Sequence, residues 1–459
     1  MQPAMIKIPS VQFIWILPFS YQATSLNDCT KFLNHHGFLK LPSNLGRVND
    51  GTYPHSGPFF LPMTNHFLFP ETEQSKGFHG YEKKLDLMIR QTIKEREIPF
   101  QIDSIEFVFC PFEIGFLTIR TQLNDLPFQE NLNAANQFRA LLQDRGAVHG
   151  IRFNYDNKEI TTTSQLLGCL VLGLPEFLLH HKMSYEPSSL VVQSLFCFEK
   201  ETPIGENEVY LAASLGADLG SSKDYITDFI KKHSYRHWMT DTWLLSDDTT
   251  FSCLTTGLQE KDEPITIQFL GPMYYALLIT MFHRQKLLQL IEDYANIRLD
   301  QDKQKIKQLI YTMDSFTSNF FFTVQPADRT SREIYQLIQT GFQIQPLYKQ
   351  IKEAQVSLFN FEETSATKRD SFLLLVLTIY TVFCGIFSMN LFAHDLVGNI
   401  HWEKLKSYNP FEYLAVLIVF SGLVVVTSLF LQSLYQGIRN KINQKKWTKE
   451  TVLSSKKRS

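Results

Sequence analysis

The densest grouping of chemically versatile side chains lies between residues 233 and 243. His233, His237, Trp238 and Asp241 occur in this stretch, which ends at Trp243. Imidazole and carboxylate groups can hold a proton or a polar ligand, and indole rings can pack against one. The grouping is therefore a candidate ligand pocket for a cytoplasmic small molecule or a nucleotide. Ordinary surface and core packing is the simpler alternative.

The rest of the chain offers no set of residues at catalytic spacing. It has no recognisable nucleophile–base pair and no paired carboxylates, so we expect a protein that is not an enzyme and has no cofactor. Two histidine pairs, His35-His36 and His180-His181, lack a second element at metal-ligand spacing. The six cysteines are scattered without a CxxC pair, which argues against a zinc site or a disulfide framework. The identity of any metal ligands stays unknown.

Two uncharged apolar segments near the C-terminus determine where the protein would reside. They cover residues 371–393 and 413–438. At ~1.5 Å per residue the first makes about 35 Å of helix, enough for a hydrocarbon core of ~30 Å. Its Leu, Ile, Val and Phe side chains contribute about −4 to −7 kcal/mol to insertion. We expect two transmembrane helices, joined by an external loop at 394–412.

Residues 1–270 are expected to form a cytoplasmic mixed α/β domain. Helices are predicted at Lys83–Glu97 and Leu132–Gln143 from their apolar spacing, and a long loop at 41–80. Strands are predicted where β-branched and aromatic residues are bounded by Pro, Gly, Asp or Asn: Val11–Leu17, Ile105–Cys110, Ile114–Thr121, Leu190–Phe198, Glu208–Ala213, Phe251–Thr255 and Ile265–Leu270.

The uncharged residues 265–282 resemble a further span but are interrupted by Gly271-Pro272. Only a short apolar run follows the break, so we expect a buried helix that begins at Met273. No Gly or Pro then occurs before Pro326. Residues 271–326 are therefore predicted to form a helical hairpin that changes direction near 296–302.

Residues 327–370 are predicted to form a long helical stalk that continues into the first transmembrane helix. The stalk begins at a capping-box pattern, Thr330-Ser331-Arg332-Glu333. Apolar residues follow at three- and four-residue spacing, so one side should be buried. Pro346 lacks an amide proton and clashes with the preceding turn, so a kink is expected there.

The distribution of charge predicts the orientation in the membrane. The loop at 394–412 carries Asp395 and Glu403 and few basic residues, whereas the tail at 439–459 is strongly basic. By the positive-inside rule both termini are cytoplasmic, and in a bacterial-type cell the membrane is the inner one. The tail would bind anionic lipid. The net charge of −2 favours no nucleic-acid partner.

This layout resembles the CorA family of magnesium channels. Members have a cytoplasmic α/β domain, a stalk helix continuous with the first of two C-terminal spans, and a basic tail. The family signature Gly-Met-Asn ends that first span, where this chain has Ser388-Met389-Asn390. The resemblance covers the last ~130 residues. Over the N-terminal domain it is architectural only.

The resemblance implies a homopentamer whose first span lines a pore for Mg²⁺ or another divalent cation. Asn390 would place a ring of side-chain carbonyls at the outer mouth, and Thr381 and Thr378 would continue the pore line. Leu374 would form a hydrophobic constriction. Neutral oxygens suit Mg²⁺ because it gives up water reluctantly. Asp395 and Glu403 would raise the local cation concentration, or would be ordinary loop charges.

Ser388 departs from the family pattern, because a glycine would be expected at a close-packed bend. This departure and the enlarged N-terminal domain keep two alternatives open. One is a ligand-gated membrane effector on the same scaffold, responding to a nucleotide signal as in some antiviral defence systems. The other is a non-conducting membrane scaffold. For Thr381, a hydrogen bond back to its own helix is the alternative to a pore role.

Overall fold

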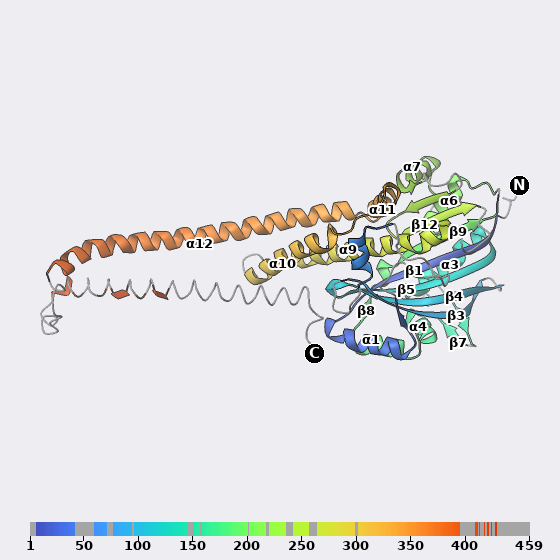
Figure 1. Ribbon diagram of the computed structural model, residues 1–459, viewed down its shortest axis with the longest axis horizontal. Helices are drawn as coiled ribbons and strands as arrows, with labels where there is room; N and C mark the ends of the chain where they lie inside the picture. Colours follow the sequence, from blue (N-terminus) through green and yellow to red (C-terminus); the bar gives the residue numbers. More distant parts are fainter. Residues whose placement is uncertain are drawn as a thin grey trace. The chain divides into compact units, whose positions relative to one another are not determined.

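The computed structural model describes most of the chain as two compact units (Figure 1). The described residues are 6–41, 59–70, 77–93, 96–145, 151–156, 158–200, 202–216, 220–235, 242–256, 264–298 and 302–394, with single positions between 409 and 428. The first unit contains Met1–Asn296 and Thr312–Ile351, and the second contains Ile297–Tyr311 and Lys352–Leu453. A mixed α/β sheet domain comes first in the chain, and helices follow it.

The described residues of the first unit build a 12-stranded sheet. Its strands are β1 (Lys7–Ser20), β2 (Leu39–Lys40), β3 (His79–Ile93), β4 (Arg96–Phe109), β5 (Ile114–Pro127), β6 (Phe153–Tyr155), β7 (Lys158–Ile160), β8 (Ser184–Tyr185), β9 (Val191–Phe198), β10 (Ser234–Tyr235), β11 (Thr242–Ser246) and β12 (Thr250–Thr256). The strand order is β10-β11-β12-β9-β1-β5-β4-β3-β6-β7, with β2 on β3 and β8 on β1. All described pairs are antiparallel except β12 with β9.

Helices lie between the strands along the chain, and a run of helices follows the last strand. They are α1 (Leu26–His35), α2 (Pro62–Leu68), α3 (Phe128–Leu142), α4 (Thr163–Leu170), α5 (Leu174–His180), α6 (Glu206–Ala213), α7 (Lys223–His233), α8 (Pro264–Leu270), α9 (Pro272–Ala295), α10 (Lys303–Phe316), α11 (Arg329–Gly341) and α12 (Ile344–His394). A π-helical turn at Thr317–Phe321 follows α10 directly.

One face of the sheet carries the main hydrophobic core. Side chains alternate along a strand, so Phe13 and Trp15 of β1 point to the same face. Both are buried and belong to the core cluster together with Phe138 of α3. The Trp15 and Phe138 rings lie 4.9 Å apart, and the Trp15 indole donates to Thr121 Oγ1 at 2.8 Å. This face therefore holds α3 against the central strands.

The opposite face is more polar and lies under α8 and α9. Ile14 of β1 pairs with Arg120 of β5 on one side and with Gln193 of β9 on the other. The Arg120 guanidinium donates to the Leu270 carbonyl, and the Gln193 amide donates to the Phe269 carbonyl. These donors satisfy carbonyls at the C-terminus of α8, which have no partner within the helix. The sheet thereby fixes the break between α8 and α9.

Helix α9 is the buried helix expected after Gly271-Pro272. Among the described residues, Ile265–Ala295 is long and apolar enough to cross a membrane, and 89% of its most apolar window is buried inside the protein. Its backbone is sharply bent at Gly271, whose φ is −107° and ψ is −94°. The core helix of a water-soluble domain has these properties, which agrees with the prediction of a buried helix start rather than a third span.

The strand predictions near Val11, Ile105, Ile114, Leu190 and Phe251 are confirmed, and so is the helix at Leu132–Gln143. The helix predicted at Lys83–Glu97 is wrong, because this segment forms most of β3 and the start of β4. Leu85, Leu87 and Ile89 point inward at two-residue spacing while Asp86 and Met88 are exposed. That alternation is typical of a strand.

Two predicted strands are helices instead. Glu208–Ala213 lies in α6, which begins after Gly205 with Glu206 and Glu208 in its first turn. Acidic side chains stabilise the positive end of a helix. Ile265–Leu270 lies in α8, whose first residue is Pro264, a favourable position for proline. The loop predicted at 41–80 contains α2 and the start of β3 among its described residues.

The stalk begins with two helices rather than one kinked rod. Helix α11 is capped by Asp328, whose carboxylate accepts from the Ser331 amide at 2.8 Å, so the cap lies two residues before the predicted Thr330. The helix ends at Gly341, and α12 begins at Ile344. Gln343 has a φ of 54°, which breaks the helical hydrogen bonding. Pro346 lies in the first turn of α12, where a missing amide costs nothing.

Candidate functional site

Helix α12 carries every residue that the sequence places along the first span. It runs without a break through 51 residues, past Ser388-Met389-Asn390 to His394. The side chains of Ser388, Met389 and Asn390 lie outside the described part of the structure, and so do Asp395 and Glu403. Their pore and loop roles stay predictions.

The inner part of the predicted pore line is described. Leu374, Thr378 and Thr381 follow one another at four- and three-residue spacing, which places them on one side of the helix. All three are exposed in the single chain. The Thr378 hydroxyl donates to the Leu374 carbonyl at 2.8 Å and the Thr381 hydroxyl to the Leu377 carbonyl at 2.7 Å. Each hydroxyl oxygen keeps acceptor capacity for a hydrated ion.

Most of the apolar surface of this part of α12 is exposed, and Leu373, Val376 and Tyr380 on one side are half-buried. Its exposed large apolar residues are Phe372, Leu374, Leu375, Leu377, Ile379 and Val382. The described positions of the following segment, among them Phe411, Leu417 and Phe420, are helical and exposed as well. Tyr380 Oη lies 3.3 Å from Ser421 Oγ. An exposed apolar surface of this size must be covered by other protein or by lipid.

The candidate ligand cluster near residue 233 is only partly described. His233 ends α7, stacks on Phe229 with ring centroids 4.5 Å apart, and bonds through Nδ1 to the Ser246 carbonyl at 3.0 Å. His237, Trp238 and Asp241 lie outside the described residues. His233 is thus held by packing and a backbone contact, and the pocket that the sequence suggested stays a prediction.

The structure does contain a buried polar network that the sequence reasoning missed. Glu106 of β4 accepts a hydrogen bond from Tyr274 of α9 at 3.0 Å and lies 3.7 Å from Arg120. Thr118 Oγ1 is 2.9 Å from the same Tyr274 hydroxyl, and the Arg120 guanidinium lies 4.6 Å from the Tyr274 ring centre. The strand register, in which Glu106 pairs with Thr118, is what brings these residues under α9.

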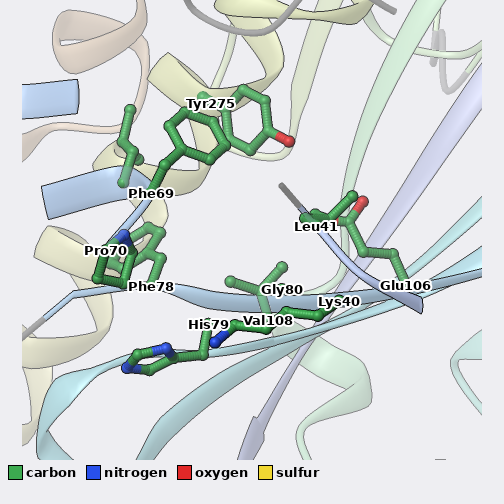
Figure 2. Close-up of a pocket in the computed structure, with 11 residues that line it drawn as sticks. Lys40, Leu41, Phe69, Pro70, Phe78, His79, Gly80, Glu106, Val108 and Tyr275 are labelled. Carbon is green, nitrogen blue, oxygen red and sulfur yellow. The ribbon is translucent and has the colours of Figure 1, made fainter. Parts of the chain in front are cut away.

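A small cavity adjoins Glu106 between β3, β4 and α9. Figure 2 shows Phe69 and Tyr275 along one wall and Gly80 and Val108 along another. The cavity volume is about 10 Å³, the space that one water occupies. Glu106 Oε1 is buried and has no hydrogen-bond partner among the described residues. A single water bound there would satisfy it.

Burial dominates the acidity of Glu106. Burial raises the pKa of this carboxyl, Arg120 lowers it and Glu82 across the strand pair raises it, and the net result is a pKa of about 7. The group therefore exchanges its proton near neutral pH. Its contacts come from both the sheet and α9, and we interpret the network as a structural link between them.

The two histidine pairs lie on α1 and α5 and continue into a stack of rings. Phe32 and Phe177 are stacked with centroids 4.0 Å apart. His36 packs on Phe32 at 4.1 Å and His181 on Phe177 at 4.2 Å. No three His, Cys, Asp or Glu side chains among the described residues gather closely enough to hold a metal ion. In this part of the chain the histidines pack two helices together.

Comparisons with known proteins leave the chain without an assigned relative. It matches no protein-family model and no curated protein. The argument for a function therefore depends on the residues and elements described above.

Proposed function

We propose that the chain is a CorA-like, homo-oligomeric membrane channel for divalent cations, with Mg²⁺ as the preferred candidate. The observation that carries this proposal is α12. Its first turns include the buried Ile344 and Ile351, and the same helix continues into residues 371–393, which carry no charge. A folded water-soluble domain is thus covalently extended by an apolar rod of membrane-spanning length.

The exposure of the apolar part supports a membrane location. Phe372 is 65% exposed and Leu374 is 64% exposed in a part of the helix that carries no charged residue. In water such a surface would be unstable, whereas in a bilayer it is favourable. By contrast, the apolar α9 is covered by its own domain and needs no membrane. Two spans, 371–393 and 413–438, with both termini cytoplasmic follow from this proposal.

The proposed pore lies along the side of α12 that carries Leu374, Thr378 and Thr381. Copies of α12 packed around an axis would direct these three side chains toward the axis, and in the arrangement that the resemblance implies Asn390 would lie at the outer mouth. The hydroxyl and amide oxygens would contact the water shell of Mg²⁺, which holds its water tightly. Leu374 would close the pore by excluding water.

An ion-flux measurement tests this proposal. The full chain reconstituted in liposomes should admit Mg²⁺, Co²⁺ or Ni²⁺ to an enclosed fluorescent indicator. Asn390→Ala should reduce the initial rate at least tenfold, because it removes the proposed ring of carbonyl oxygens. Asn360→Ala is the matched control, since Asn360 lies exposed on the stalk part of α12, and its rate should equal that of the wild type.

Two results would contradict the proposal. Wild-type rates in Asn390→Ala would remove the pore assignment of that residue. Absence of flux for every ion in vesicles that contain correctly inserted protein would favour the non-conducting scaffold.

A further inference from the structure

A second cavity lies beside the turn between β11 and β12. It has a volume of about 70 Å³ and is bounded by the segment before β9, by the turn and by one side of α9. One water needs about 10–15 Å³ of such space, so the cavity admits a ligand of several non-hydrogen atoms. The wall residues used below are Ser188, Asp248, Thr249, Met281, Arg284 and Leu288.

The cavity wall carries one positive side chain, Arg284, and one negative side chain, Asp248, which do not form an ion pair with each other. Arg284 donates through its guanidinium to the backbone carbonyl of Asp248 at 2.6 Å. Burial lowers the pKa of Arg284, and the Asp248 carboxylate counteracts that effect from nearby. Within the described part of the chain the Asp248 carboxylate forms no ion pair with Arg284. A carboxylate and a guanidinium are therefore both available to a ligand.

The remaining walls divide into polar and apolar parts. The hydroxyls of Ser188 and Thr249 can donate or accept, and they make no side-chain hydrogen bond to any described residue. Met281 is buried and Leu288 is 40% exposed, and both line the cavity. These residues thus supply the site with one positive group, one negative group, two hydroxyls without a side-chain hydrogen bond and an apolar wall.

We propose that this cavity binds a small zwitterion, a molecule that carries a carboxylate and an ammonium group a few bonds apart, as an α-amino acid does. The guanidinium of Arg284 would donate charge-assisted hydrogen bonds to the ligand carboxylate. The carboxylate of Asp248 would hold the ammonium group. A simple anion would meet the charge of Asp248 and a simple cation that of Arg284, so each is disfavoured.

The same arginine connects the cavity to the break between α11 and α12. The guanidinium carbon of Arg284 lies 5.6 Å from the centre of the Phe342 ring, in a cation–π contact. Phe342 is fully buried and follows the last residue of α11. We call residues 341–343 the hinge. A ligand that draws the Arg284 guanidinium into the cavity weakens the contact between this group and the hinge. The weaker contact shifts the conformational equilibrium of the hinge and of the start of α12.

The effect on conduction depends on the proposed function, but ligand binding does not. Calorimetry on the full chain in detergent therefore tests the site by itself. L-alanine is the probe, and propionate and ethylamine are its analogues that lack the ammonium and the carboxylate. We expect saturable heat with L-alanine and at least tenfold weaker binding of both analogues.

Two variants locate the site. Asp248→Asn keeps the shape of an exposed turn residue and removes its charge, and Arg284→Gln removes the guanidinium. Each should weaken L-alanine binding at least tenfold. Arg90→Gln is the control, because it removes an exposed arginine that pairs with Glu97 on β4, and it should bind as the wild type does. If the Arg284→Gln variant fails to fold, L-alanine binding to the Asp248→Asn variant tests the location of the site by itself.

The proposal is overturned if no saturable heat is seen, if propionate binds as well as L-alanine, or if Asp248→Asn binds normally. Hydrogen exchange tests the connection to the hinge: the Phe342 and Gln343 amides should exchange at least threefold faster with L-alanine bound. Unchanged exchange would reject that connection. Absence of ion flux alongside intact binding would contradict the channel and leave the site standing.

Discussion

Glu106 illustrates how a single residue can make the domain sensitive to pH. Its carboxyl is buried, it accepts from Tyr274, and its pKa is raised to about 7 from an ordinary 4.5. The folded protein therefore keeps a proton that the unfolded chain releases between about pH 4.5 and 7. The free energy of unfolding contributed by this residue is largest below pH 4.5 and falls as the pH rises to 7.

Glu106→Gln tests this dependence, because the amide keeps an acceptor for Tyr274 and cannot ionise. Relative to this variant, wild-type stability should decrease by on the order of 3 kcal/mol between pH 4.5 and pH 7.5. Urea unfolding followed by tryptophan fluorescence measures the difference at each pH. A difference that stays constant across the range would show that Arg120 keeps the carboxylate ionised throughout.

Among the elements, the hinge at 341–343 packs closely against the sheet domain. A Cβ atom added to Gly341 would lie 2.9 Å from both the carbonyl carbon and the carbonyl oxygen of Ser246 and would also clash with its hydroxyl. Backbone atoms at the end of β11 cannot move aside easily. The close approach explains why α11 ends with a glycine against the end of β11.

Gly341→Ala should therefore destabilise the first unit by about 1–3 kcal/mol, as overpacking does elsewhere. Gly168→Ala is the matched control: its added Cβ would make ordinary contact, 3.5 Å from Pro175 Cγ, inside helix α4. It should be neutral or stabilise by up to about 1 kcal/mol. Thermal unfolding in detergent compares the two. Equal melting temperatures for both variants would argue against a tight contact at Ser246.

Sequence patterns predicted elements well where one periodicity was clear. Long β-branched or aromatic runs such as Val11–Leu17 were identified correctly as strands, and so was the buried start of α9. The apolar pattern of short segments such as Glu208–Ala213 fits a strand and a helix equally well. The neighbouring residues that cap the segment determine which of the two forms. The β3 segment was misread because Leu85, Ile89 and Ile93 recur at four-residue spacing, which fits one face of a helix as well as one face of a strand.

The two cavities and the Glu106 network could not be read from the sequence. Glu106, Thr118 and Tyr274 meet only because β4 pairs with β5 in one particular register and α9 crosses above them. Arg284 and Asp248 come from different elements as well. Such sites depend on long-range pairing, which local spacing does not encode. The spacing of Leu374, Thr378 and Thr381 in the sequence predicted that they share one side of a helix. The role of these residues in a pore is still a prediction.

For the whole molecule, the proposed function predicts an assembly rather than a single chain. A single α12 would expose both its polar oxygens and its apolar side chains to lipid. In a ring of α12 copies the oxygens face the central axis and the apolar side chains face the lipid. We expect the detergent-solubilised particle to have a mass about five times that of the 53.3 kDa chain. Native mass spectrometry measures this mass. A monomer or dimer would leave no axis for ions to pass along.

The central place of β1 has a consequence for how the protein is made. This strand precedes both of its neighbours in the chain, yet β5 and β9 pair with it through residues as distant as Pro127 and Cys197. At roughly 5–20 residues per second, the nascent chain waits roughly 10–40 seconds before β9 emerges. During that interval the segment Val11–Phe19 is an unsatisfied, aggregation-prone edge, and a chaperone at the exit tunnel would shield it.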